Sequence, residues 1–266
     1  MTRVRSALRI ARFAVATLDA IGRARLARGD AADRASRLHA ACTEIARIHE
    51  LRLGVRGTFP SHPCVIVTNH VGYLDAIAVA AVLPCAPIAK SEVTRWPMIG
   101  TAADQLGVIF VERDDPWSRV RALRRAMAAL RAGVSVLNFP EGTTTDGTRL
   151  LPFQRGIFGL ARLAGVPVLP VAVRCAPELA WYGGASFVPH YLRTTRLPAP
   201  ELRLDVGQPI DPARHASADE VAALAHHRIA YMLRDHLESH ASVIRLRVPP
   251  PRPDAVLPPA RRRVAR

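Results

Sequence analysis

The chain has 266 residues, of which 49% are hydrophobic and 22% charged, which is typical of a globular domain with a substantial core and excludes a mainly disordered chain. Its net charge of +15 is concentrated at the two ends. Residues 1–56 hold twelve arginines against five acidic residues, residues 245–266 hold seven against one, and the part between them is close to neutral.

Hydrophobic periodicity predicts helices and strands that alternate along the chain. Apolar residues at helical spacing predict helices at 3–28, 31–51, 75–83, 117–132, 156–164 and 217–240. Short apolar runs predict strands at 52–56, 64–68, 88–90, 107–112, 134–139, 167–174 and 202–206. Pro84 and Pro87 end the third helix, and Gly133 and Gly165 end the next two. The alternation favours the α/β class, with a largely parallel sheet flanked by helices.

Three segments are expected. Residues 1–54 form N-terminal amphipathic helices that associate with a membrane, residues 55–244 form the main domain, and residues 245–266 form a basic tail rich in proline and arginine. We expect this tail to be disordered from Pro249 onward. Anionic lipid attracts such basic segments by about 1 kcal/mol per basic residue. Nucleic acid would attract them too, and a purely solubilising tail is a further alternative.

The first predicted helix has an apolar stripe, formed by Leu8, Ala11, Val15 and Leu18. The stripe suits a lipid surface and packing against the protein's own core equally well. No run of 18 or more uninterrupted apolar residues is present, and the best candidate, 13–22, is interrupted by Asp19 and lacks a small-residue cleavage site. We therefore expect peripheral or monotopic attachment, with neither a spanning helix nor a secretory signal.

The cysteines are widely scattered, at Cys42, Cys64, Cys85 and Cys175. They form no C-x-x-C pair, so the sequence predicts neither zinc nor a disulfide framework, but small buried side chains in a reducing, cytoplasmic compartment. No G-x-S-x-G or phosphate-binding Walker loop is present, which argues against a serine hydrolase and a P-loop nucleotidase.

The most informative segment follows the predicted strand 64–68. It reads Asn-His-Val-Gly-Tyr-Leu-Asp and places His70 at a strand end, with Asp75 five residues later. An imidazole can take a proton from an alcohol near neutral pH, and a carboxylate on its other nitrogen fixes its tautomer. The alternative, a helix-capping His70 and a solvated Asp75, stays open for this short motif on its own.

A second strand end carries Phe-Pro-Glu-Gly-Thr, with Glu141, Gly142 and Thr143. Lys90, the single lysine of the sequence, and Arg113 also lie at candidate strand ends, where α/β sheets bind ligands. Their cations suit a phosphate, although a solvated loop for Lys90 and a surface ion pair for Arg113 are alternatives.

Taken together, these segments resemble the glycerolipid acyltransferases of the lysophosphatidic acid acyltransferase type. Four blocks match in order within roughly residues 55–215, and their segments are 69–75, 107–113, 139–143 and 166–171. Two positions depart from the family pattern: Gly72 stands where the family often has serine, and Thr144 stands where it has an arginine that helps to hold the acceptor phosphate.

The resemblance implies acyl transfer from an acyl thioester, on CoA or acyl carrier protein, to the hydroxyl of a lysolipid. His70 would be the base and Asp75 its orienting partner, while Lys90 and Arg113 would hold the head group. Glu141 would bind the acceptor hydroxyl or position Arg113, with a helix first-turn acid as the alternative. Gly142 and Thr143 would offer N–H groups to the reacting carbonyl.

Lysophosphatidic acid is the expected acceptor, and another lysolipid such as lyso-ornithine lipid is the alternative. The expected partner surface is an anionic membrane at the cytoplasmic face, with no nucleic acid, metal or redox cofactor. Outside the enzyme class, the alternative is a non-catalytic protein that binds membranes or nucleic acid through its basic ends.

Overall fold

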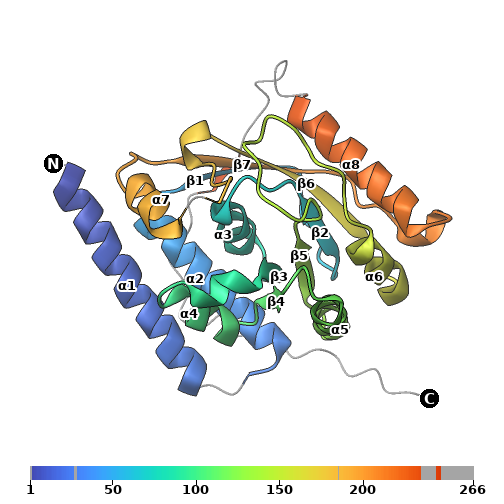
Figure 1. Cartoon of the computed structure of the whole chain (residues 1–266), viewed down its shortest axis with the longest axis horizontal. Helices are drawn as coiled ribbons and strands as arrows, with labels where there is room; N and C mark the ends of the chain where they lie inside the picture. Colours follow the sequence, from blue (N-terminus) through green and yellow to red (C-terminus); the bar gives the residue numbers. More distant parts are fainter. Residues whose placement is uncertain (1, 27–28, 185, 235–243, 247–266) are drawn as a thin grey trace.

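The computed structural model describes residues 2–26, 29–184, 186–234 and 244–246 (Figure 1). Its α-helices are α1 (Thr2–Leu26), α2 (Ala31–Ile48), α3 (Tyr73–Val82), α4 (Ile99–Gln105), α5 (Pro116–Arg131), α6 (Gly156–Ala164), α7 (Phe187–Thr194) and α8 (Ala218–Arg234). Short 3-10 helices are η1 (Ser91–Arg95), η2 (Pro177–Leu179) and η3 (Pro212–Arg214). The strands are β1 (Arg52–Arg56), β2 (Val65–Thr68), β3 (Cys85–Lys90), β4 (Ile109–Val111), β5 (Ser135–Asn138), β6 (Val168–Cys175), β7 (Glu201–Val206) and β8 (Ile244–Leu246).

One sheet joins the strands of the described residues in the order β4-β3-β5-β2-β6-β7-β1-β8. The strands from β4 to β6 in this order run parallel to one another, β7 is antiparallel to β6, and β1 is parallel to β7. The predicted α/β class with a largely parallel sheet is confirmed. Because β2, β3, β4 and β5 end at the same edge of the sheet, the loops that follow them meet there, and these loops carry the predicted site residues.

Alternating side chains along the central strands separate two hydrophobic layers. Ile66 and Leu137 face a cluster that includes residues of α1 to α4, whereas Val65, Val67 and Val136 face a cluster built largely by α5, α6 and α8. The helices of these two layers also lie on different sides of the molecule in Figure 1. The central strands are therefore buried on both faces, as expected for parallel strands.

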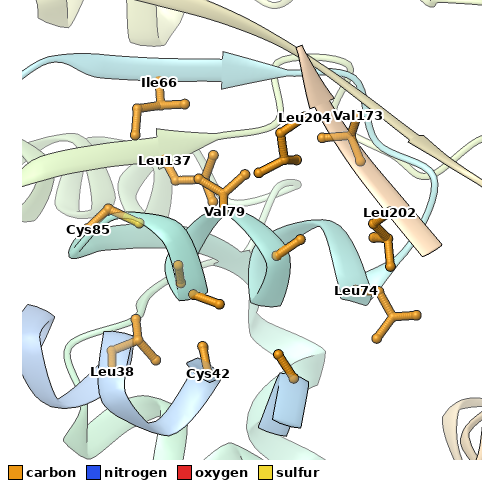
Figure 2. Close-up of a cluster of buried hydrophobic side chains, with 14 of the residues drawn as sticks. Leu38, Cys42, Ile66, Leu74, Val79, Cys85, Leu137, Val173, Leu202 and Leu204 are labelled. Atoms are coloured by element: carbon orange, nitrogen blue, oxygen red, sulfur yellow. The ribbon is translucent and has the colours of Figure 1, made fainter. Parts of the chain in front are cut away.

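The core on the first face has three tiers (Figure 2). Ile66 and Leu137 of the sheet face α3, where Val79 is completely buried. The other side of α3 packs on α2 around Leu38 and Cys42. Helix α3, which carries Asp75, is thus packed between the sheet and α2. The cysteines Cys42, Cys64 and Cys85 are buried and unpaired, and burial raises the pKa of the Cys42 thiol to about 12.

Helix α1 packs on the body through a partly polar stripe. Arg9, which is only 3% exposed, donates to the carbonyl oxygens of Thr195 (2.9 Å) and Leu197 (2.8 Å). The ring of Phe13 packs against that of Tyr191 of α7 in a tilted arrangement, with the centroids 5.1 Å apart. The apolar stripe predicted from the sequence faces outward instead, with exposed side chains at Leu8, Ala11, Val15 and Leu18. Within the described part of the chain, no helix combines the length and the apolar character that crossing a bilayer would require.

Several element boundaries differ from the predictions. Strand β3 begins at Cys85 rather than Ile88 and therefore contains Pro87, which pairs with Leu137 of β5. On its other side, β3 pairs with β4 only from Ile88 onward, so the missing N–H of Pro87 removes no bond there. Helix α3 begins at Tyr73, two residues earlier than predicted.

Other elements were not predicted at all. The short helices α4 and α7 were missed, and β8 forms an antiparallel edge with β1 where the sequence indicated the start of the tail. The end of the last predicted helix, 235–240, and the expected disorder from Pro249 onward lie outside the described residues.

Candidate active site

His70 and Asp75 meet where β2 passes into α3. His70 follows the end of β2, and Asp75 lies in the first turn of α3, so one tight connection brings the two side chains together. The Nδ1 atom of His70 lies 2.9 Å from Oδ2 of Asp75. Because an ionised carboxylate only accepts, Nδ1 is the protonated nitrogen and Nε2 keeps its lone pair. No hydrogen-bond partner of Nε2 is present among the residues described.

The Asp75 carboxylate also closes the turn that holds His70. Its Oδ2 accepts from the backbone N–H of Val71 (2.7 Å) and of Gly72 (2.9 Å) in addition to the imidazole. Asp75 is 1% exposed and lies at the N-terminus of α3, where the helix dipole favours a negative charge. The position of this charge is therefore determined by backbone geometry as well as by the imidazole.

Distant segments secure the backbone on both sides of His70. Asn69 is buried, and its side chain donates to the carbonyl of Val173 (2.9 Å) and accepts from the N–H of the same residue (2.7 Å). This paired contact ties the residue directly after β2 to β6, beyond the last ladder pair of the two strands, Thr68 with Val171. The N–H of Thr145 donates to the carbonyl of His70 (2.9 Å). These bonds leave the imidazole little freedom to move with its backbone.

The absence of a side chain at Gly72 has a structural explanation. A Cβ atom at this position would lie 3.2 Å from the backbone nitrogen of Trp181 and 3.5 Å from the carbonyl oxygen of Leu179. The same segment donates from Trp181 N–H to the carbonyl of Val71 at 2.7 Å. Glycine therefore permits the 179–181 segment to approach the motif closely, where the resembling family often has serine.

Glu141 binds the backbone of His70 and not its imidazole. It is 5% exposed, and its two oxygens accept from the backbone N–H of His70 (2.8 Å) and of Leu151 (2.9 Å). Burial raises the pKa of the Glu141 carboxyl, although the two backbone donors act in the opposite direction. Within the described chain it forms no hydrogen bond or ion pair with Arg113, which was one of its predicted roles. Its other predicted role, a contact with the acceptor hydroxyl, stays a prediction.

The turn after Glu141 presents free backbone donors. The N–H of Gly142 is already used, because it donates to the carbonyl of Phe139 at 3.1 Å. The N–H groups of Thr143 and Thr144 have no acceptor among the described residues, and both threonines line the cavity described below. Of the two predicted donors to a reacting carbonyl, Thr143 is therefore the available one.

Arg113 and Lys90 lie at the ends of the two outermost parallel strands. Arg113 follows β4 and donates from Nη1 to the carbonyl of Gly142, and burial lowers the pKa of its guanidinium, which nevertheless stays cationic. Lys90 ends β3 and forms an ion pair with Glu92, with both side chains about half exposed. The structure brings both cations to the same cavity as His70.

This cavity has a volume of about 1970 Å³, larger than the usual range for small-molecule sites. Its polar part includes His70, Lys90, Arg113 and Arg149, together with the threonines that follow Gly142. Between α1, α2, α3 and α4 the lining includes the apolar residues Leu38, Cys42, Ile45, Ile77, Ile99, Ala102, Leu106 and Val108, together with the charged residues Arg12, Asp19, Arg23, Arg37, Glu44 and Arg47 of α1 and α2. The cavity therefore offers both apolar and charged side chains to a ligand that has a charged head and a long apolar chain.

Comparison with known proteins identifies the family. The sequence profile described as Acyltransferase matches residues 46–174. A lyso-ornithine lipid O-acyltransferase of Rhizobium meliloti (strain 1021) is 32% identical over 211 residues, which cover 72% of this chain and 72% of the relative. This chain belongs to the acyltransferase family. The 1-acyl-sn-glycerol-3-phosphate acyltransferase alpha of Homo sapiens is 38% identical over 135 residues, 48% of each chain.

A solved structure shares the fold of this acyltransferase. The 1-acyl-sn-glycerophosphate (LPA) acyltransferase PlsC from Thermotoga maritima superposes with a TM-score of 0.68 at 21% sequence identity. The match covers 91% of this chain and all of the other.

Sequence reasoning missed part of the acyltransferase site. The ring of Phe139 stacks on the imidazole of His70 with centroids 3.9 Å apart, and Asn69 and Thr145 anchor the backbone of the motif. Asn69 and Phe139 were quoted only as letters of matching blocks. A polar amide directly after a buried strand is a signal that could have indicated Asn69, whereas the contact of Phe139 depends on two strands meeting in space.

Proposed function

We propose that this acyltransferase transfers a fatty acyl group from an acyl thioester to the free hydroxyl of a lysolipid. The observation that carries the proposal is the His70–Asp75 pair, whose Nε2 atom has no hydrogen-bond partner among the described residues and borders a large cavity lined by both cationic and apolar side chains. Nε2 takes the proton of the acceptor hydroxyl while the oxygen of this hydroxyl attacks the thioester carbonyl. The carbon–sulfur bond then breaks, and the imidazolium returns the proton to the leaving thiolate.

The other site residues support this reaction. Asp75 stabilises the imidazolium, and Glu141 positions His70 through the backbone. The N–H groups of Thr143 and Thr144 are suited to the oxyanion that develops on the carbonyl oxygen. The apolar cavity between α2, α3 and α4 accommodates an acyl chain.

For the acceptor, an amino-acid lysolipid is favoured over lysophosphatidic acid. Relatives named lyso-ornithine lipid O-acyltransferase align over 72% and 73% of this chain, whereas relatives named 1-acyl-sn-glycerol-3-phosphate acyltransferase align over 48%. In addition, Thr144 stands where the resembling family has an arginine, so one of the cations expected to contact a phosphate is missing. Lysophosphatidic acid is the second candidate, because Arg113, Lys90 and Arg149 all border the cavity. Incubation of the purified protein with a labelled acyl thioester and a panel of lysolipids tests the function directly.

The head-group contacts can be tested by two substitutions. If lysophosphatidic acid is bound by Arg113, Arg113→Ala should lower kcat/KM for it by about 10- to 150-fold, the equivalent of a charged hydrogen bond of about 1.5–3 kcal/mol. Thr144→Arg should shift preference toward the phosphate-bearing acceptor, because it adds a cation at the cavity wall. Values of kcat/KM for both acceptors with wild type and both variants are the measurement.

The contact between Arg113 and the Gly142 carbonyl offers a competing, structural role. An equal loss for both acceptors in Arg113→Ala, with no effect of Thr144→Arg on either, would assign Arg113 to holding the turn. Arg162→Ala is a suitable control, since this arginine lies on α6 and donates to the carbonyl of His215, outside the cavity lining.

We further propose that the enzyme attaches peripherally to the cytoplasmic face of a membrane through α1. The outward stripe of this helix carries Val4, Leu8, Val15 and Leu18, and the adjacent helix α7 exposes Val188 and Leu192. Basic residues Arg3, Arg5 and Arg12 on the same helix suit anionic lipid. The same helix borders the cavity, so a lipid acceptor would enter from this side. The unpaired buried cysteines fit a reducing compartment.

Vesicle binding should depend on the outward stripe. The double variant Leu8→Asp/Leu18→Asp should bind anionic vesicles at least about tenfold more weakly, since burial of a leucine contributes about 1.5–3 kcal/mol and tenfold corresponds to about 1.4 kcal/mol. Its thermal stability should be unchanged, because both side chains are exposed. Flotation with vesicles of anionic and neutral lipid measures the effect.

Leu163→Asp is the matched control, because Leu163 is 82% exposed on α6. Unchanged flotation of the double variant would exclude α1 as the attachment site. Deleting the helix would be a poorer test, since Arg9 and Phe13 pack against the body and their loss would disturb it.

A further inference from the structure

The imidazole of His70 is held on one face as well as at its edge. At the edge, Nδ1 lies 2.9 Å from Oδ2 of Asp75. On the face lies the phenyl ring of Phe139, whose plane is 22° from that of the imidazole and whose centroid is 3.9 Å away. A hydrogen bond to one nitrogen restrains the position of that atom but leaves the ring free to tilt. The stacked phenyl ring restricts this tilt.

The phenyl ring reaches His70 because two neighbouring parallel strands end side by side. Phe139 directly follows Asn138, the last residue of β5, and β5 pairs with β2, which precedes His70. The carbonyl of Phe139 closes a turn by accepting from the N–H of Gly142 at 3.1 Å. Within the same turn, Glu141 accepts from the backbone N–H of His70 at 2.8 Å. One short turn therefore contacts both the backbone and the ring of His70.

The stacking has a consequence for the charge that forms on the imidazole. The face of an aromatic ring carries the negative part of its quadrupole and attracts a cation within about 6 Å of its centroid. The separation of 3.9 Å between His70 and Phe139 is well inside this limit. An imidazolium gains more from this face than a neutral imidazole does, so the attraction increases as the proton is transferred. Interactions that strengthen in this way accelerate a reaction.

We propose that Phe139 is a positioning residue for the base: it fixes the plane of the imidazole with Nε2 beside the cavity and stabilises the imidazolium. The inference rests on the proposed acyl transfer and adds a residue to its machinery. The competing role for Phe139, which is 8% exposed, is packing in the first hydrophobic cluster. Packing depends on the shape of the ring, whereas attraction of a cation depends on the electron density of its face.

Fluorination separates these two roles. Trifluorophenylalanine in place of Phe139, fluorinated at the para and both meta positions, nearly keeps the shape of the ring but withdraws electron density from its face. We expect kcat to fall about three- to tenfold, with the KM of the lysolipid unchanged. A monofluorinated ring should give a smaller loss, and Phe139→Leu, which has no ring, the largest. The substrates are palmitoyl-CoA or palmitoyl acyl carrier protein, and lyso-ornithine lipid or lysophosphatidic acid, whichever the wild type uses best.

Phe153 is the matched control. Its ring is also partly buried and stacks on that of Phe158 with centroids 6.2 Å apart, but it lies outside the cavity lining. Trifluorination of this ring should leave kcat unchanged. NMR gives a readout that does not depend on activity, because the ring current of Phe139 should shift the ring-proton signals of His70. These signals are identified by their absence in His70→Ala, and Phe139→Leu should abolish the shift.

The other outcomes contradict the proposal in distinguishable ways. Unchanged kcat after trifluorination of Phe139, or an equal loss after trifluorination of Phe153, would overturn stabilisation of the imidazolium. A higher KM with unchanged kcat would assign Phe139 to substrate binding instead. Identical His70 ring signals in Phe139→Leu and wild type would overturn the stacking itself. A normal ring-current shift in a wild type that acylates no lysolipid would refute the proposed function, and with it any catalytic use of the stacking.

Discussion

His70→Ala should fold normally and lose about 10²–10⁴-fold in kcat, the usual contribution of a general base. Only the imidazole is removed, because the bonds of His70 to Glu141 and Thr145 use its backbone N–H and carbonyl. Without the ring, the Nε2 atom that would take the proton of the attacking hydroxyl is lost. Single-turnover rates with saturating acyl thioester and lysolipid measure the loss, and circular dichroism checks the fold.

Asp75→Asn should also be severely impaired, because the amide cannot stabilise the imidazolium as a carboxylate does. His227→Ala, an exposed histidine on α8, is the control and should keep wild-type turnover. A well-folded His70→Ala protein with near-normal turnover would remove His70 from the mechanism and require another base.

Asp205→Ala should destabilise the protein by about 3 kcal/mol, the lower end of the range for breaking a buried ion pair. Asp205 lies on β7 and is 6% exposed. Its Oδ1 lies 2.8 Å from Nε of Arg56 on β1, and its Oδ2 lies 3.1 Å from Nη2 of Arg174 on β6. Loss of the carboxylate removes the negative charge that lies between the two cations on β1 and β6, the strands on either side of β7. The free energy of unfolding in urea measures the effect.

Asp19→Ala is the comparison, because Asp19 pairs with Arg23 at the surface and exposed pairs contribute about 0–1 kcal/mol. Asp205→Asn should fall between the two, since the amide can still accept from Arg56. Equal stabilities of Asp205→Ala and Asp19→Ala would show that the ion pairs of Asp205 contribute no more than a surface pair.

The part of the site that the sequence determined is local. His70 and Asp75 are five residues apart, and a buried strand with a helix soon after it brings their side chains near each other. The sequence likewise predicted the class of the fold. The spacing of apolar residues distinguishes helices from strands, and their alternation along the chain indicates an α/β fold. Matching blocks in the right order then indicated the reaction, and Thr144 and Gly72 were visible as departures from it.

Tertiary structure decided the roles that depend on segments far apart in the chain. Glu141 is 71 residues from His70, and Val173 is 104 residues from Asn69, so no spacing rule predicts that they hydrogen bond. The orientation of α1 was also undecided, because an apolar stripe fits a core or a lipid surface equally well. Buried contacts of Arg9 with Thr195 and Leu197 determine which side of α1 faces inward, and such contacts exist only once distant elements have packed together.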